Sequence, residues 1–187
     1  MNMKFGGIFI ILVIILIAIY AVSIYNKFAT LGNKVDEAFS TMDVYLKKRY
    51  DLIPNLVETV KGYAKHESET LEKVISARNK AISSTTPDAK AEAEKELSGT
   101  LSRLLALTEA YPDLKANTNF QDLQKQLTNM EGEIANSRKY YNGVVKSFNT
   151  MVDTFPSNLL AGIFGFHKQP LFTVTSESER ENVKVQF

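Results

Sequence analysis

One short segment of the chain carries residue types that suit hydrolytic metal chemistry. His66 and Glu67 are adjacent, and zinc peptidases place two histidines one helical turn apart with a glutamate between them that activates water. The position that needs the second histidine is Thr70. The whole chain has only 2 His and no Cys, which excludes a three-histidine zinc site and any thiolate site. We therefore expect no bound metal.

Other catalytic signatures are also missing from the sequence. The chain has no Gly-x-Ser-x-Gly nucleophile elbow, no Gly-x-Gly-x-x-Gly turn and no Gly-Lys-Ser/Thr phosphate loop. With 22 Lys+Arg against 21 Asp+Glu, the net charge of +1 lacks the excess of positive charge that nucleic-acid binding needs. We predict a protein that is not an enzyme, with no cofactor and no nucleic-acid partner.

A cluster of polar residues occupies positions where helical spacing predicts a buried seam. Three of them, Arg49, Glu67 and Arg78, fall on the seam itself, and five lie close by: Asp51, Asn55, Glu58, Lys61 and His66. A buried charge that has no partner costs several kcal/mol, so we expect at least one of the arginines to pair with a carboxylate. The set is interpreted first as a structural polar network that fixes helix register, and alternatively as a ligand or partner site. A carboxylate-bridged metal site ranks last, because the Glu-x-x-His repeats of di-iron bundles are missing.

The N-terminal residues predict a membrane anchor rather than part of a core. No charged residue occurs between Phe5 and Asn26, and about 20 helical residues span the roughly 30 Å hydrocarbon layer of a bilayer. A cleaved signal peptide is the alternative, but its apolar region is usually shorter than this run. We assign residues 1–4 to a short flank and residues 5–25 to a single-pass transmembrane helix. Positive charges lie on both sides of the span, so they leave its orientation open.

The elements that must position the polar residues are helices, and residues 26–154 are predicted to form a bundle of four. The first helix runs to about Tyr50, where Pro54 interrupts, and the second begins between Asp51 and Pro54, with Asp51 as its cap. Turn residues follow it at 83–88, and Pro112 ends the third helix. The fourth shows a coiled-coil-like heptad repeat from Phe120 to Phe155. The predicted fold is all-α, an N-terminal transmembrane helix followed by an up-and-down antiparallel four-helix bundle.

The C-terminal residues differ in kind from the bundle. Residues 155–172 are apolar and interrupted by glycine, and they are too short to cross a bilayer as a helix. They are expected either to fold back over one end of the bundle or to contact lipid or a neighbouring subunit. Six residues would make that contact: Phe155, Leu159, Leu160, Ile163, Phe164 and Phe166. Residues 173–187 form a polar tail, in which Val183, Val185 and Phe187 alternate with polar residues and suit a strand that pairs with another chain.

The polar seam also carries a resemblance to a known family. The stretches 48–67, 71–74 and 77–78 resemble the signature of the LemA family of bacterial membrane proteins. The similarity extends over the N-terminal anchor and over four further segments: 37–49, 110–117, 138–142 and 155–166. It therefore covers nearly the whole chain.

The resemblance implies a membrane-tethered helical bundle with no established enzymatic activity. Relatives are often encoded beside a membrane zinc metalloprotease, and others take part in building magnetosome membranes. Some resemble lipoproteins, which would place the bundle outside the cytoplasm. The main functional hypothesis is a self-assembling scaffold at the bacterial membrane that contacts lipid and other copies of itself. The alternative is an adaptor that binds a membrane metalloprotease or another membrane protein.

Overall fold

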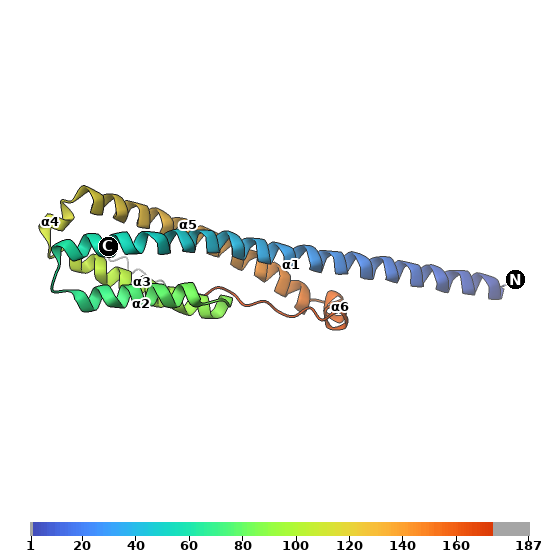
Figure 1. Ribbon diagram of the computed structural model, residues 1–187. Helices are drawn as coiled ribbons and strands as arrows, with labels where there is room; N and C mark the ends of the chain where they lie inside the picture. The colour runs from blue at the N-terminus through green and yellow to red at the C-terminus, as the bar shows by residue number, and fades with distance from the viewer. Residues whose placement is uncertain (1, 174–187) are drawn as a thin grey trace, which may run out of the picture. The chain divides into compact units, whose positions relative to one another are not determined.

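The computed structural model describes residues 2–173, with side chains from residue 6 onward, and every regular element in that range is a helix. The six helices are shown in Figure 1: α1 (Asn2–Tyr63), α2 (Ser68–Ser83), α3 (Pro87–Thr108), α4 (Pro112–Lys115), α5 (Thr118–Asp153) and α6 (Ser157–Phe164). The all-helical fold with a long apolar N-terminal helix is confirmed. The up-and-down order of the bundle stays a prediction. The expected strand at Val183 to Phe187, like the tail from residue 174, lies outside the described residues.

The chain divides into two compact units, and both long helices contribute to each. The first unit contains α1 up to Phe39, α5 from Tyr141 onward, and the chain to Gln169, which includes α6. The second unit contains α1 from Ser40, the helices α2, α3 and α4, and α5 up to Tyr140. Each unit is described separately below.

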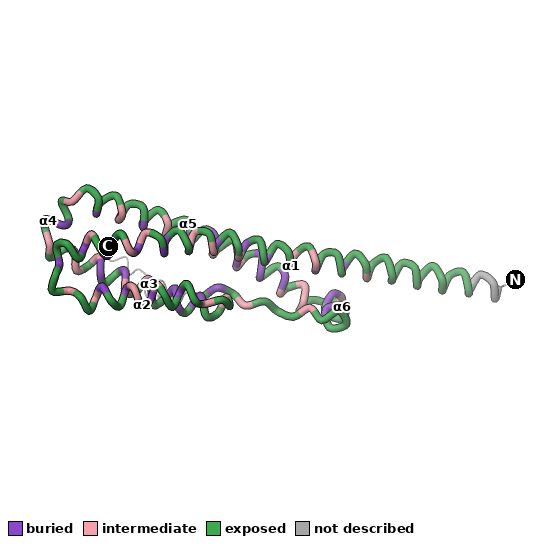
Figure 2. The backbone as a smooth tube through the Cα atoms, in the orientation of Figure 1, coloured by how far each residue is buried: buried purple, intermediate pink, exposed green. Residues whose placement is uncertain are grey.

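The N-terminal part of α1 leaves its apolar side chains uncovered. Residues 8–17 are all large aliphatic or aromatic residues, and every one of them is exposed (Figure 2). This part of the helix is long and apolar enough to cross a membrane. Buried positions begin at Ile24 and Phe28 and recur at helical spacing from there. The change from exposed to buried apolar residues coincides with the end of the charge-free run.

The predicted break at Pro54 is wrong, because α1 continues through this proline to Tyr63. Pro54 therefore lies inside the helix, and Asp51 is an interior residue rather than a cap. A proline in a helix interior leaves the carbonyl four residues earlier without its usual donor. The helix ends instead just after Gly62, where glycine is a weak helix former. Residues assigned to one second helix are consequently divided between α1 and α2.

In the second unit, α2 and α3 pack against each other and are connected by the predicted turn. Thr86 caps α3, since its side-chain oxygen accepts a hydrogen bond from the Ala89 amide at 3.3 Å, and Pro87 occupies the first turn. Lys80 on α2 pairs with Glu96 on α3 at 2.5 Å. This contact raises the pKa of the Lys80 ammonium, through the hydrogen bond first and the carboxylate charge second. The hairpin is thus capped at its turn and bridged between its helices.

The start of α5 is also set by a local cap. The side-chain oxygen of Asn117 accepts a hydrogen bond from the Phe120 amide at 3.0 Å, which satisfies one of the free donors of the first turn. The heptad residues Phe120, Leu127, Ile134 and Tyr141 are buried as the repeat predicts. Phe155, the last of the series, lies beyond the helix and is exposed.

Candidate functional site

The charged centre of the second unit is Arg49, whose side chain is only 1% exposed. Its guanidinium forms ion pairs with Glu94 on α3 and Glu131 on α5, and it donates a hydrogen bond to the Ser98 hydroxyl at 3.3 Å. Glu94 is itself 2% exposed, whereas the Glu131 side chain is 48% exposed. The pairing that we expected for a buried arginine is therefore present. It connects three helices of this unit through one side chain.

Tyr50 extends this network on the next residue of α1. Its hydroxyl donates a hydrogen bond to the Glu94 carboxylate. Burial raises the pKa of Tyr50 to about 12, and the nearby Asp43 carboxylate adds to this effect while Arg49 opposes it. The phenol is therefore protonated, and able to donate, throughout the physiological range.

Arg78 holds the backbone of α1 at the interior proline. Its Nε donates a hydrogen bond to the Tyr50 carbonyl oxygen at 2.7 Å. This is the carbonyl that would accept from residue 54 in an uninterrupted helix, and proline has no N–H to offer. The side chain of α2 thus supplies the donor that α1 lacks.

A smaller polar group lies where α1 ends. The Tyr111 hydroxyl donates to Glu67 Oε1 at 3.3 Å, and the Asn117 side-chain amide donates to the Tyr63 hydroxyl at 2.9 Å. Burial and the Glu67 carboxylate raise the pKa of Tyr111. These two bonds connect the loop after α1 to the joint around α4.

The predicted polar set therefore separates into two groups. Arg49, Glu67 and Arg78 take part in contacts between helices, while the remaining five are exposed: Asp51, Asn55, Glu58, Lys61 and His66. The carboxylates Glu94 and Glu131 were not identified from the sequence, and neither was the buried Lys90, which pairs with Asp43. Within the described residues, no three metal-binding side chains come together.

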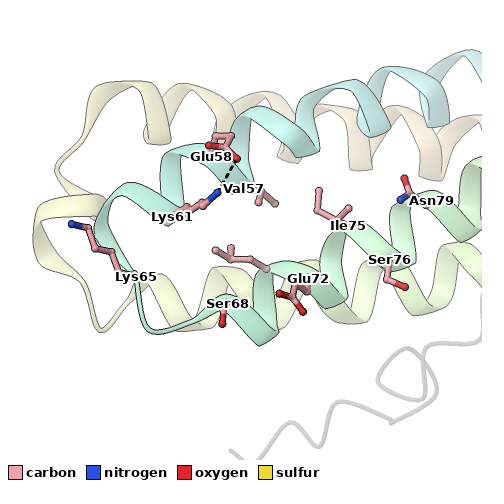
Figure 3. A pocket seen from close by; sticks show the side chains of 10 residues that line it. Val57, Glu58, Lys61, Lys65, Ser68, Glu72, Ile75, Ser76 and Asn79 are labelled. Carbon is pink, nitrogen blue, oxygen red and sulfur yellow. Dashed lines mark ion pairs between the residues drawn. The ribbon is translucent and has the colours of Figure 1, made fainter.

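Two of the exposed residues line a groove between α1 and α2. The groove has a volume of about 550 Å³, and its apolar floor consists of Val57, Leu71 and Ile75. Figure 3 shows Val57 and Ile75 pointing into the space between the two helices. Four charged residues form the rim: Glu58, Lys61, Lys65 and Glu72. Glu58 and Lys61 face each other at 3.6 Å, so the rim carries balanced charge around an apolar centre.

The first unit contains an aromatic cluster at the end of the apolar run of α1. Tyr25 contacts the rings of Phe164 and Phe166, with centroid distances of 5.0 and 5.8 Å. Phe166 also stacks on Phe28 at 4.6 Å, and Phe28 meets Phe148 of α5 at 5.8 Å. The C-terminal segment thus folds back onto α1 and α5. Folding back was one of the two alternatives expected for this segment.

The opposite face of this segment is not covered. Of the six residues assigned to membrane or subunit contact, Phe155, Leu159 and Ile163 are strongly exposed, and Phe164 is partly exposed beside Tyr25. Leu160 and Phe166 are half-buried. The structure therefore brings one side of the segment into the aromatic cluster and leaves an apolar side free.

Residues 38–187 match the model of the LemA family. This chain belongs to the LemA family. It is 27% identical over 162 residues to Protein LemA of Metamycoplasma hominis, a match that covers 84% of this chain and 72% of the relative. It is also 23% identical over 174 residues to Magnetosome protein MamQ 2 of Paramagnetospirillum magneticum, covering 79% of this chain and 64% of that protein. Magnetosome protein MamQ of Magnetospirillum gryphiswaldense is 22% identical over the same shares. The resemblance inferred from the polar seam is confirmed. This LemA-family chain is a helical protein, and residues 2–173 include one segment that can span a membrane.

Proposed function

We propose that this LemA-family chain is a non-enzymatic scaffold, anchored in the bacterial membrane by α1, whose copies assemble with one another. The observation that carries the proposal is the distribution of exposed apolar side chains. They are concentrated on the first part of α1 and on the segment around α6. Soluble monomers rarely expose contiguous apolar surface of this extent, so lipid and neighbouring protein are the natural covers.

The buried polar residues support a structural rather than a catalytic role. Arg49 and Glu94 neutralise each other inside the second unit, and Arg78 is engaged by the backbone of α1. Groups that are paired in this way fix the positions of helices and are not directed toward a cleft. The similarity to relatives named as magnetosome proteins further supports a structural role at a membrane.

The test of this proposal is the mass of the full-length protein in lipid nanodiscs or mild detergent. A scaffold should give a discrete multimer that persists on dilution, and the same sample unfolded in strong detergent gives the mass of one chain for comparison. A single copy per particle at every concentration would contradict self-assembly.

The groove between α1 and α2 favours a second candidate function, an adaptor that binds a membrane zinc metalloprotease. An apolar floor with a charged rim suits an amphipathic helix, whose apolar side chains would enter the groove. Reversing the rim charges with Lys61→Glu and Glu72→Lys should weaken binding of the purified protease in co-reconstituted membranes. The matched control is Glu69→Lys, an exposed change on α2 outside the groove. Equal binding of the protease by the natural chain, by the variant that carries both rim changes and by Glu69→Lys would reject the adaptor.

A further inference from the structure

The short helix α6 has two faces of opposite character. Ser157 and Ala161 are buried against the first unit, whereas Leu159 and Ile163, one helical turn apart, are 59% and 74% exposed. Phe155, just before the helix, is 79% exposed on the approach to it. Side chains four residues apart lie on the same side of a helix. Leu159 and Ile163 therefore share one apolar face of the helix, and the exposed Phe155 precedes it.

Several specific contacts hold this face in a fixed orientation. Gly165 adopts a left-handed conformation with φ of 74°, and the Phe166 amide then bonds back to the Ala161 carbonyl at 2.9 Å. After this turn, the side-chain amide of Asn149 forms two hydrogen bonds of 2.8 Å with the backbone of Gln169. It donates to the Gln169 carbonyl oxygen and accepts from the Gln169 amide. These contacts fix the position of α6 and therefore the direction in which its uncovered face points.

The position of α6 along α1 identifies what covers the face. Phe164 of α6 contacts Tyr25 on α1, and Phe166 just after the helix contacts Phe28. The first charged residue after the apolar run of α1 is Lys27. A tyrosine next to the end of a membrane span typically lies among the lipid headgroups. Contact with Tyr25 therefore sets α6 at the level of the membrane surface when α1 spans the bilayer.

Size and continuity favour lipid over a second copy of the chain. Stable protein interfaces bury about 1,200–2,000 Å² in total. The two exposed apolar side chains on the eight-residue helix, with Phe155 just before it, provide only a small fraction of that area. The exposed side chains of Ile19 and Val22, inside the apolar run of α1, lie within two turns of Tyr25, so α6 docks close to the lipid-facing part of α1. Interfacial helices use such a face to enter the boundary between headgroups and acyl chains.

We propose that α6 is an interfacial helix, which inserts Leu159 and Ile163, together with Phe155 just before the helix, into the same leaflet boundary where α1 leaves the bilayer. The proposal rests on the membrane anchoring by α1 that the proposed function includes. It adds a second, surface-bound contact with lipid.

The test uses single-cysteine labelling. Each label attaches only at the introduced cysteine, because the natural chain has no cysteine. The full-length protein is labelled with an environment-sensitive fluorophore at Ile163→Cys on α6, at Ile14→Cys in the span, or at Glu69→Cys as an exposed control on α2. Each variant is reconstituted in phosphatidylcholine vesicles, with and without lipids that carry a nitroxide quencher on the upper acyl chain. We expect a blue-shifted emission and a large loss of fluorescence at residue 163, and no loss at residue 69.

The span probe, measured also with a quencher deeper in the acyl chain, separates the two proposals. Quenching at residue 14 without quenching at residue 163 would overturn the interfacial helix and leave the anchor intact. No quenching at either residue would overturn both proposals. Self-quenching between labels at residue 163, without quenching by lipid, would show a second copy on this face and would also overturn the inference.

Discussion

Arg78 Nε lies 2.7 Å from the carbonyl oxygen of Tyr50 and donates the hydrogen bond that Pro54 cannot. An interior proline costs a helix about 3 kcal/mol, partly through the lost hydrogen bond. Because a side chain from α2 replaces this donor, α1 continues to Tyr63. The relationship explains both why the predicted break is absent and why an arginine lies on the seam of α2.

The effect of removing Arg78 should depend on Pro54. Arg78→Ala leaves a partly buried carbonyl without a donor, and we expect a loss of about 1–3 kcal/mol in the free energy of unfolding. In a Pro54→Ala background the helix supplies its own donor, so the same change should cost less. Chemical denaturation of the four proteins of this double-mutant cycle measures the coupling. Additive losses would show that Arg78 does not act through the proline.

Removing Arg49 should destabilise the second unit more than any exposed substitution. Arg49→Ala leaves the Glu94 carboxylate buried without its cation, which costs about 3–5 kcal/mol. Adding Glu94→Gln should restore part of the loss, because the neutral amide needs no counter-charge. Glu131→Gln is the matched control, and its effect should be small because Glu131 is half exposed. Thermal unfolding followed by circular dichroism distinguishes these cases, and equal melting temperatures for the natural chain and Arg49→Ala would contradict the role of the network.

Tyr50 should make stability fall in strongly alkaline solution. Burial raises the pKa of its hydroxyl to about 12 in the folded chain, against 10.0 when unfolded. The folded state therefore favours the protonated phenol. The stabilisation is complete below pH 10 and is lost as the pH rises from there to about 12. It amounts to about 2–3 kcal/mol, from about 1.4 kcal/mol per pH unit.

The comparison of the natural chain with Tyr50→Phe isolates this contribution. The variant cannot ionise at residue 50, so its free energy of unfolding should fall less steeply between pH 10 and 12. Parallel curves for the two proteins over that interval would show that Tyr50 titrates at its ordinary pKa.

Gly165 should be required for the docking of α6. Its positive φ strains any side chain with a Cβ, so Gly165→Ala should cost about 1 kcal/mol and loosen the contact of Phe166 with Phe28. Gly162 is the matched control on the same helix, since it has no positive φ and a methyl group there would meet open space. At that position, alanine should be neutral or slightly stabilising. Hydrogen exchange of the α6 amides should therefore quicken in Gly165→Ala and not in Gly162→Ala.

The helices could be predicted from the sequence because apolar spacing and turn residues are local signals. The charge-free run before Lys27, the turn residues at 83–88 and the heptad repeat from Phe120 are such signals. They correspond to the apolar part of α1, the junction of α2 and α3, and α5. The continuation of α1 through Pro54 is not predictable from local sequence, because the replacement donor is Arg78, which is 24 residues away and on another helix. A local rule has no access to such a partner.

Within the buried ion-pair network of the candidate site, only Arg49 could be predicted from the sequence. Its place on an apolar seam indicates burial and hence pairing. Glu94 and Glu131 gave no comparable signal, because glutamates are common on exposed helix faces and their partner depends on how helices pack. The sequence likewise indicates that the segment around α6 is apolar. Its position beside Tyr25 is known only from the structure, because the two segments are far apart in the sequence.

The aromatic cluster of the first unit has a consequence for the timing of synthesis. Tyr25 and Phe164 are separated by about 140 residues, and at 5–20 residues per second a ribosome needs roughly 7–28 seconds to bridge them. The anchor therefore emerges, and can enter the membrane, long before the residues that cover Phe28 exist. Until then Phe28 remains a free apolar group beside the nascent span, open to chaperones or to lipid, and the first unit is completed only after Phe164 and Phe166 have been synthesised.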